Sequence, residues 1–599
     1  MKKTLTCLLA LCMALTMVLT ACGPSGSTES QSPVTSSGPA ASDPAGTESE
    51  GVVLPSQDGV EKVLKGWTSP RTTFNPQMYT NSKSIENLGT FVAQMAKMDG
   101  SNEMEFVPYF AEELPSSEDG LVWTVKLREG LTWNDGTPIN ADTYIYSGQM
   151  LLDPKLVNSN ASYLFTTCIV VNAEEYFKGN CAWEDVGLKK IDDLTLEFTL
   201  EYPASELDFN TTIGALFWPV KEDVYEACMN EDRTSTTYAT SLETTPSCGA
   251  WTLTKWVIDG YEEFEVNEND PLVQMGYYKL DAINQRYLSS SATRSELFFS
   301  NELDYHTLTA DEYAIYKDDP RVYQSESPNV WGIFVNADSD NPIMANKDFR
   351  MALQYSAPRE ELAVDVFAFY TPANYMISTG TMVTDADGNT VAYRDTDLAK
   401  ANAEQFANDN EKALEYFEKA YEANGNQKIT VNMLYFDGQE SMKRWAEVCQ
   451  ETWETLFGRD RFELTVTATV AATCYDIYET GNYDLGCGVR LATVFNPYEY
   501  MYYWTTDYPT KYITGFDNEE FDELYQEAAF GDLVTDPAKR LEALARMEQL
   551  IMEEGAFIPI MQNDNVVIYN SRIWLATEEY LPQIGYAVNQ CDIVEDPTA

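Results

Sequence analysis

The stretch VPYFAEELPSSEDGLVWTVKLREGLTWNDGTPINAD, at residues 107–142, contains signals for a strand, a turn and a helix start. Side chains at 121–127 alternate between two faces, one of them entirely apolar, and this period of two predicts a β-strand. The Asn-Asp-Gly run at 134–136 predicts a turn. Asn140 is a favourable N-cap residue, so we expect a helix from there to about Met150. The stretch therefore predicts a domain of mixed α and β structure.

The same signals continue towards the C-terminus. Residues 194–200 alternate like 121–127, and 251–256 with 261–266 predict a hairpin. In the second half helices and strands alternate, which indicates an α/β lobe. The expected helices there are 347–355, 411–424, 439–457 and 537–554, and the expected strands are 428–436 and 462–470.

The composition excludes several classes of function. The 599 residues hold 95 Asp and Glu against 39 Lys and Arg, a formal net charge of −56. Such a charge repels phosphates, so it excludes nucleic-acid binding as a main role and disfavours docking on anionic lipid through basic patches. One histidine, His306, argues against histidine-rich zinc sites and histidine-based triads, and no Walker A or GxGxxG motif occurs. We therefore expect no metal ion and no cofactor, and a structural role for His306.

The first residues are interpreted as a secretory signal peptide. Two lysines precede an apolar run at 5–19, which is short for a membrane span. Leu-Thr-Ala-Cys at 19–22 resembles a bacterial lipobox, which implies that residues 1–21 are cleaved and that Cys22 carries the lipid. The alternative is an ordinary cleavage site beside an unrelated cysteine.

Residues 22–59 are expected to form the lipidated cysteine and a disordered linker. The linker is rich in Ser, Gly, Pro, Thr and Ala and has no aromatic residue. Such a segment cannot bury enough apolar area to offset its ordering entropy. It would act as a flexible tether between the membrane and the folded body.

Eight of the eleven cysteines lie beyond Cys22. None belongs to a CxxC pair, which argues against a zinc ribbon or a redox motif. Outside the cytosol disulfides are permitted, and Cys168 with Cys181 and Cys228 with Cys248 are the nearest pairs in sequence. Free buried thiols are the alternative.

The block at 107–142, closed by Leu-Leu-Asp-Pro at 151–154, resembles the family 5 extracellular solute-binding proteins of ABC importers, the oligopeptide- and dipeptide-binding group. Weaker blocks follow in the family's order at 248–256, 334–353 and 556–560. The resemblance implies an α/β, two-lobed fold of the type II periplasmic-binding-protein kind, with a hinge and an extra strand-rich subdomain in the first lobe. The implied parts are lobe 1 at 60–320 plus 556–599, the subdomain at about 91–214 inserted in it, and lobe 2 at 321–555.

The resemblance also implies a function. The protein would not be an enzyme: it would capture a solute, most readily an oligopeptide, between two closing lobes and deliver it to an ABC permease with separate ATPase subunits. In this family bound peptides lie extended against the protein backbone. We expect a monomer outside the cytoplasm, held to the membrane by lipid and facing the periplasm if the cell is Gram-negative. The alternatives are an oligosaccharide or other organic solute in the same fold and, more remotely, a secreted glycosidase with two carboxylates.

The segment 483–497 departs from the family pattern. Matching Pro497 to the family's proline puts Thr493 where peptide binders have an Asp for the ligand's α-ammonium, and Arg490 where they have a Trp. A buried ammonium needs an anionic partner, whereas an arginine suits a carboxylate. We therefore expect the ligand to present a carboxylate to Arg490 rather than its amino terminus to Thr493. The alternative is that Arg490 forms a structural salt bridge.

Other candidate ligand contacts follow from the resemblance. Val489 and Leu491 flank Arg490, Tyr79 falls in a loop of the first lobe, Trp331 precedes the hinge strand, and Met561 follows the returning strand. Aromatic residues and methionines are more often core than site, so core packing is the alternative for them. Tyr500, Tyr502, Tyr503 and Trp504 are either a stacking platform for the ligand or a packed helix face.

Overall fold

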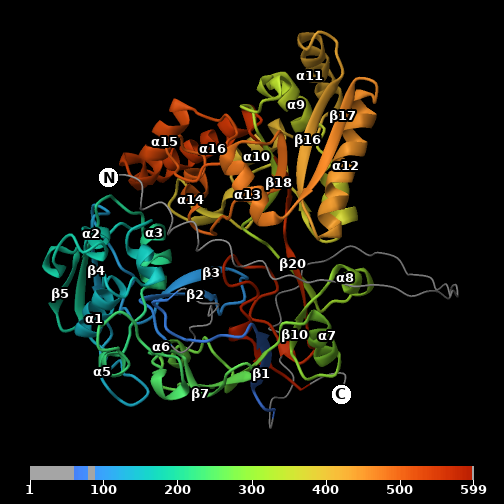
Figure 1. The fold of residues 1–599 in the computed structure, drawn as a ribbon. Helices are drawn as coiled ribbons and strands as arrows, with labels where there is room; N and C mark the ends of the chain where they lie inside the picture. Colours follow the sequence, from blue (N-terminus) through green and yellow to red (C-terminus); the bar gives the residue numbers. More distant parts are fainter. Residues whose placement is uncertain (1–59, 79–87, 596–599) are drawn as a thin grey trace, which may run out of the picture.

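Two lobes, joined by two crossings of the chain, make up the computed structural model of the protein (Figure 1). The structure describes residues 60–78 and 88–595. The expected signal peptide, the lipidated Cys22, the linker and the candidate Tyr79 lie outside these residues. Lobe 1 is the lower body of Figure 1, and lobe 2, which contains the orange helices and strands, stands above it.

The inserted subdomain of lobe 1 is built around the stretch that opens the sequence analysis. The predicted strand is β4, and it pairs with β6, which pairs in turn with β5. The side chains of Trp123 and Val125 are buried, and Trp123 stacks on Phe209 with ring centroids 4.2 Å apart. Asn140 caps helix α1, as predicted, by accepting a hydrogen bond from the backbone of Thr143. The elements of the subdomain are β2 (Val92–Ala96), β3 (Met104–Pro108), β4 (Val122–Lys126), α1 (Ala141–Leu151), α2 (Ala173–Phe177), β5 (Leu188–Asp192), β6 (Thr195–Thr199), α3 (Glu206–Thr211) and α4 (Ile213–Leu216).

The rest of lobe 1 holds a four-stranded sheet in the order β1-β9-β8-β7 and a three-stranded sheet in the order β10-β20-β11. The predicted hairpin is confirmed as β7 and β8. Apolar side chains from the four strands, among them Leu64, Trp251 and Phe264, form a core separate from that of the subdomain. The elements are β1 (Val63–Thr68), α5 (Glu222–Ala227), β7 (Trp251–Val257), β8 (Tyr261–Val266), α6 (Pro271–Gln274), β9 (Ala282–Tyr287), α7 (Ser291–Phe299), β10 (Tyr305–Thr307), α8 (Ala310–Tyr316), β11 (Val322–Ser325), β20 (Asn565–Tyr569), β21 (Ile573–Trp574) and β22 (Asp592–Ile593).

Lobe 2 has the predicted α/β character. Its six-stranded sheet has the order β13-β19-β12-β18-β16-β17, with β16 parallel to β17 and β18 and with β12 antiparallel to β18 and β19. The elements are β12 (Val330–Val335), α9 (Lys347–Tyr355), β13 (Thr371–Pro372), β14 (Met382–Thr384), β15 (Thr390–Ala392), α10 (Asp397–Gln405), α11 (Asn410–Ala423), β16 (Ile429–Phe436), α12 (Glu440–Phe457), β17 (Phe462–Thr469), α13 (Ala471–Thr480), β18 (Leu485–Gly488), α14 (Pro497–Tyr502), α15 (Glu519–Ala529), α16 (Pro537–Glu553) and β19 (Phe557–Gln562).

The helices of lobe 2 form where amphipathic periodicity and caps coincide. Helix α12 buries Trp445, Val448 and Trp453 in the core of the lobe, at the spacing of one helix face. Asp536 caps α16, the helix predicted at 537–554, through a hydrogen bond from the backbone of Lys539. Shortly after α16 the chain turns at Gly555, whose φ of 59° is a conformation that glycine adopts without steric cost.

The two crossings lie slightly further along the chain than the expected limits of the lobes. β11 pairs with β20 in lobe 1 and β12 pairs with β19 in lobe 2, so the first crossing is residues 326–329. The second crossing is Asn563 and Asp564, between β19 and β20. β19 was expected to belong to lobe 1, but it pairs with β12 within the sheet of lobe 2. Its apolar side chains are fully buried there, which explains its place.

All eight described cysteines are free thiols. Neither candidate disulfide is formed. Six of these cysteines are buried, including Cys168, whose Sγ lies 3.0 Å from the hydroxyl oxygen of Thr212. The structure therefore agrees with free thiols and not with the candidate disulfides.

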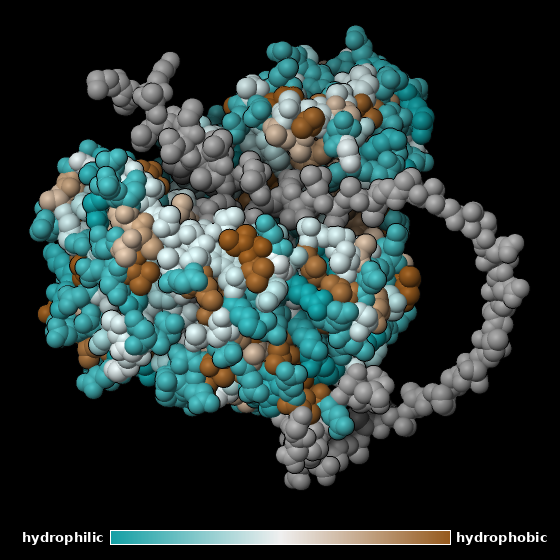
Figure 2. All heavy atoms as spheres, turned by 60° about the horizontal axis from the view of Figure 1, so that its bottom comes forward, coloured by the Kyte–Doolittle hydropathy of each residue, from teal (hydrophilic) through white to brown (hydrophobic). Residues whose placement is uncertain are grey.

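The outer face of lobe 1 is mainly hydrophilic (Figure 2). Apolar residues appear on that face as small separate spots, as is usual for a protein surface. Within the described part of the chain, no helix combines the length and the apolar character needed to cross a membrane.

Candidate ligand-binding site between the lobes

Residues 489–496, named here the site loop, connect β18 to α14. β18 lies beside the hinge strand β12 in the centre of the lobe 2 sheet. The backbone amide of Ala492 donates a hydrogen bond of 2.9 Å to Oδ1 of Asn329, in the first crossing. The site loop is therefore fixed at the edge of lobe 2 where the chain enters from lobe 1.

Arg490 packs against aromatic rings of lobe 2. Its guanidinium carbon lies 3.2 Å from the ring centroid of Tyr512 and 5.0 Å from that of Tyr503. Its Nη2 donates to the carbonyl of Thr510 at 2.7 Å. Arg490 forms no ion pair with any of the described residues, so the structural salt bridge weighed above is absent from that part of the chain. Its positive charge lies against ring faces and a carbonyl, and the nearby carboxylate of Glu479 feels that charge without forming an ion pair with it.

The other predicted residues of the site loop differ in exposure. Thr493 and Leu491 are exposed, and Val489 is buried. The hydroxyl of Thr493 donates to the carbonyl of Asn496 at 3.0 Å, so it stabilises the turn of the loop. Nothing in these contacts supplies the anion that an ammonium group would need.

Two residues of the site loop that sequence analysis missed bind lobe 1. Val494 and Phe495 are buried in a small apolar cluster with Leu207 of α3. The ring of Phe495 lies 5.8 Å from that of Phe106 in β3. Their apolar character was visible in the sequence, but the contact joins positions about 390 residues apart, and no local pattern predicts it.

Trp331 and Met561 lie in the two strands that leave the hinge. Met561 in β19 is fully buried, as a core residue would be. Trp331 in β12 is half-buried and packs near Phe436 and Trp445, with ring centroids 6.1 and 6.4 Å away. The two residues are paired across neighbouring strands. Both therefore belong to the framework below the site loop.

The tyrosine-rich segment after the site loop is mainly a packed helix face. Tyr500 and Trp504 are buried in the core of lobe 2, while Tyr502 is exposed. His306 is buried in lobe 1, and its Nε2 lies 3.0 Å from a carboxylate oxygen of Glu312. Burial lowers the pKa of His306, which fits the structural role that was expected.

A group of polar side chains surrounds the two crossings, and sequence analysis did not identify it. Asp564 accepts hydrogen bonds from the backbone of Ser327 at 3.1 Å and from side chains of Gln324, Gln562 and Thr371 at 3.1, 2.8 and 2.6 Å. Asp564 is almost fully buried, and burial raises the pKa of its carboxyl. These bonds hold the two crossings together at the hinge.

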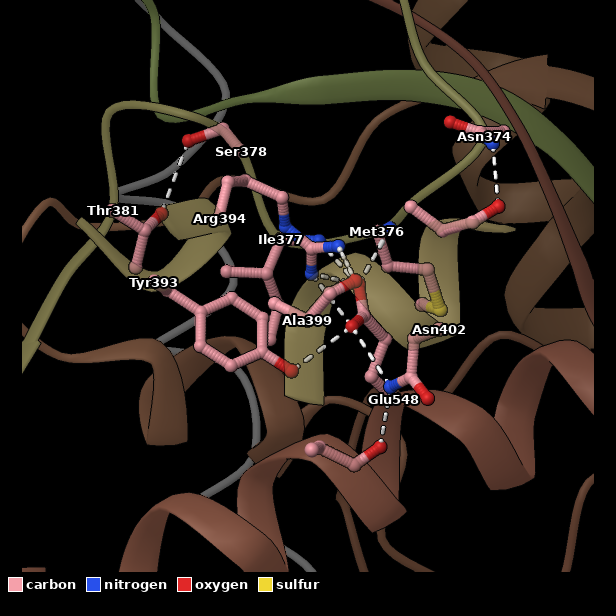
Figure 3. Close-up of polar contacts among 12 residues, drawn as sticks. Asn374, Met376, Ile377, Ser378, Thr381, Tyr393, Arg394, Ala399, Asn402 and Glu548 are labelled. Atoms are coloured by element: carbon pink, nitrogen blue, oxygen red, sulfur yellow. Dashed lines mark hydrogen bonds and ion pairs between the residues drawn. The ribbon is translucent and has the colours of Figure 1, made fainter. Parts of the chain in front are cut away.

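A buried network of polar side chains surrounds Glu548 of α16 (Figure 3). It supports residues 374–384, which lie next to the site loop. The carboxylate of Glu548 pairs with Arg394 at 2.6 Å and accepts from the hydroxyl of Tyr393 at 3.0 Å. It also accepts from the backbone amides of Met376 and Ile377 at 3.0 and 3.1 Å. Through these hydrogen bonds, Glu548 fixes residues 374–384 against α16.

The same segment then reaches both the hinge and the site loop. The amide of Thr379 donates to Oε1 of Gln562 at 3.0 Å, at the end of β19. Three residues later the amide of Met382 donates to the carbonyl of Val494 at 2.7 Å, in the site loop. The Glu548 network thus positions the site loop indirectly, through residues 374–384.

The lobes also meet away from the hinge, where α3 faces α14 and α16 (Figure 1). Nη1 of Arg540 lies 2.7 Å from Oδ2 of Asp208. Beside this pair, the hydroxyl of Thr167 donates to Oε1 of Glu499 at 2.9 Å. The site loop lies between this contact and the hinge.

The geometry defines a class of protein. Two α/β lobes are joined by two crossings, and the site loop, whose Arg490 forms no ion pair with the described residues, lies where they meet. The described residues contain no group of three or more His, Cys, Asp or Glu side chains placed to hold a metal ion. The fold and the site are those of a two-lobed, hinged solute-binding protein.

Comparison with known proteins gives the family. The sequence profile of the bacterial extracellular solute-binding proteins, family 5, matches residues 105–512, and the chain belongs to that family. It is similar to the dipeptide-binding protein DppE of Bacillus subtilis, with 24% identity over 509 residues that cover 84% of this chain and 87% of DppE.

Two solved structures share the fold. The MppA periplasmic murein tripeptide-binding protein in its unliganded open form gives a TM-score of 0.71 at 18% identity, covering 91% of this chain and 99% of MppA. Listeria monocytogenes OppA bound to peptide gives a TM-score of 0.60 at 19% identity, covering 89% of this chain and 99% of OppA. The two-lobed fold expected from the resemblance is thereby confirmed.

Proposed function

We propose that the protein captures oligopeptides between its two lobes and delivers them to an ABC importer. The observation that carries this proposal is the site loop, which lies between the hinge and the second interlobe contact in a chain of family 5. Similarity to a dipeptide-binding protein and to an OppA bound to peptide supports a peptide as the ligand. An extended peptide would offer backbone groups to the walls of the cleft, which is the strand-addition mode of recognition.

Arg490 is proposed to bind a carboxylate of the ligand. Its guanidinium lies over the ring of Tyr512. One of its N–H groups donates to the carbonyl of Thr510, and an arginine has further N–H groups that can donate to a ligand. The five remaining candidates are proposed to line the site around it or to support it. They are Val489, Leu491, Thr493, Trp331 and Met561, and the proposed contact of Tyr79 lies outside the described residues.

The proposed cellular setting follows from the N-terminal sequence. A cleaved signal at 1–21 and a lipid on Cys22 would tether a monomer outside the cytoplasm, with 22–59 as the linker. Its partners would be a membrane permease and separate ATPase subunits. A change of Cys22 to Ala would then release the protein from the membrane fraction, which immunoblotting of cell fractions measures.

The proposed function is tested by thermal shift with the protein freed of co-purified ligand by unfolding and refolding. Pools of tri- to hexapeptides are expected to raise the melting temperature, because a ligand that binds the folded state alone stabilises it. Pools of oligosaccharides are expected to leave it unchanged. A shift with oligosaccharides and none with peptides would favour the alternative ligand class and contradict the proposal.

A further inference from the structure

Glu326 lies at the start of the first crossing, between the two lobes. Its backbone carbonyl accepts a hydrogen bond of 2.7 Å from the hydroxyl of Tyr580 in lobe 1. Its carboxylate Oε2 accepts one of 2.6 Å from the hydroxyl of Thr379 in lobe 2. The residue is half-buried, and its Oε1 forms no hydrogen bond with the described residues. One carboxylate oxygen therefore remains to bind a further donor.

The negative charge of Glu326 has no positive partner among the described residues. Burial raises the pKa of its carboxyl, and the charges of Asp564 and Asp395 raise it further. Asp564 has its own oxygens occupied by neutral donors from Ser327, Gln324, Gln562 and Thr371. A cation placed at Glu326 would offset this local excess of negative charge.

Tyrosine rings lie close to this carboxylate. Tyr580 and Tyr586 have ring centroids 5.9 Å apart, and Tyr586 lies 4.8 Å from Tyr323. The charge of Glu326 contributes to the raised pKa of both Tyr580 and Tyr586, after the larger effect of burial. Carboxylates beside aromatic faces are favourable surroundings for an ammonium group.

Glu326 lies in the same crossing as the residue that anchors the site loop. Asn329, three residues further along the crossing, accepts the hydrogen bond of Ala492 in that loop. Three residues of extended chain span at most about 11 Å. A ligand that touches the site loop is therefore within a few residues' length of the Glu326 carboxylate.

We propose that Glu326 binds a positively charged group of the ligand, the α-ammonium of an oligopeptide, at the hinge side of the interlobe space. This inference rests on the proposed function and adds the anion that Thr493 does not provide. Binding would place the ammonium against Oε1 of Glu326. The protein's preference for peptides with a free amino terminus would then come from the hinge rather than from the site loop.

A second interlobe carboxylate, Glu499, is the competing position. Its Oε1 accepts from Thr167 in an interface that is already closed by the packing of Phe495 on Phe106. Asp208 beside it is paired with Arg540. Glu499 therefore belongs to the contact between the lobes away from the hinge, whereas Glu326 lies in the crossing itself, bonded to Tyr580 of lobe 1 and Thr379 of lobe 2.

The test compares two matched pools of tri- to hexapeptides that contain no Lys, Arg or His. One pool has free amino termini and the other is N-acetylated, so the amino terminus is the only cation that differs. Binding to the full chain is measured by native mass spectrometry for the unmodified protein and for Glu326→Gln, Glu499→Gln and Glu404→Gln. Glu404 is exposed on α10 and serves as a control for the same change of charge.

The unmodified protein and Glu404→Gln are expected to bind the free-amine pool about 10- to 100-fold better than the acetylated pool, the range for a hydrogen bond to a charged group. Glu326→Gln is expected to lose this preference and to keep its binding of the acetylated pool, which also shows that it is folded. A preference that survives in Glu326→Gln, or that is lost in Glu499→Gln instead, would overturn the inference. Equal binding of both pools by the unmodified protein would overturn the inference but not the proposed function. Binding of neither pool would contradict both.

Discussion

Asp208 in lobe 1 and Arg540 in lobe 2 form a buried ion pair of 2.7 Å between the lobes. Only 6% of the Asp208 side chain and 13% of the Arg540 side chain are exposed. Arg540 also donates to the carbonyl of Ala528 at 2.9 Å and lies over the ring of Tyr498. Arg540 is thus fixed within lobe 2, and its Nη1 points at Asp208 in lobe 1. The pair joins the lobes on the side away from the hinge.

Asp208→Asn is predicted to destabilise the protein and loosen the lobes. Removing one partner of a buried pair leaves the other charge unpaired, which costs about 3–5 kcal/mol. Urea unfolding measures that cost, and small-angle X-ray scattering is expected to show a larger radius of gyration. The control is Glu520→Gln, since Glu520 pairs with Arg546 at the surface. Exposed pairs contribute about 0–1 kcal/mol, so an equal cost in both variants would refute the structural role given to Asp208.

Glu548→Gln is predicted to weaken both stability and ligand binding. The change removes the partner of Arg394, whose side chain is 8% exposed, and we expect a loss of about 3–5 kcal/mol. Because residues 374–384 then lose their anchor, the site loop is expected to lose order as well. Hydrogen exchange of the amide of Met382 reports this directly, since that amide donates to Val494. Unchanged exchange at Met382 in the variant would show that the network does not support the site loop.

Asp270 is predicted to make stability depend on pH. Burial raises the pKa of its carboxyl to about 6, although the hydroxyl of Tyr109 donates to it at 2.6 Å. Since the folded pKa lies above the unfolded value of about 4, this contribution to stability is complete below pH 4 and is lost as pH rises through 6. A difference of two units between the folded and unfolded pKa values corresponds to about 3 kcal/mol in the free energy of unfolding.

Asp270→Asn removes that titration. The free energy of unfolding of the variant, relative to the unmodified protein, is therefore expected to rise by about 3 kcal/mol between pH 4 and pH 7. Urea unfolding at a series of pH values measures the difference, in which other titrating groups cancel. A difference that stays constant across this range would contradict the assignment to Asp270.

Arg490→Gln is predicted to remove the preference for peptides with a free carboxylate. The unmodified protein should bind them about 10- to 100-fold better than their C-terminal amides, as expected for a charged hydrogen bond. Isothermal titration with matched pairs measures the ratio. Arg490→Lys keeps the charge and is the control, with part of the preference retained. If Arg490→Gln discriminates as well as the unmodified protein does, Arg490 has only its packing role on Tyr512.

The fold could be predicted from the sequence because its signals are local and dense. The alternation at 121–127 became β4, and Asn140 became a helix cap. The α/β alternation of the second half became the six-stranded sheet of lobe 2. The limits of the lobes were less predictable, since a strand pattern such as that of β19 does not say which sheet it joins.

The interlobe site was predicted only in part. Arg490 was identified by its departure from a family pattern, and the structure places it on the site loop without an ion pair to the described residues. Asp208 and Arg540 are 332 residues apart, and Glu326 and Thr379 are 53 apart. Such pairs depend on the arrangement of whole elements, and acidic residues are so frequent in this chain that none is notable by itself.

The most direct test is native mass spectrometry of the purified, tag-free protein, followed by denaturing release of whatever is bound. If the protein captures oligopeptides between its lobes, the released material will be a mixture of short peptides bound one per chain. A single non-peptide compound bound at the same stoichiometry would contradict a peptide-binding role while leaving the two-lobed architecture intact.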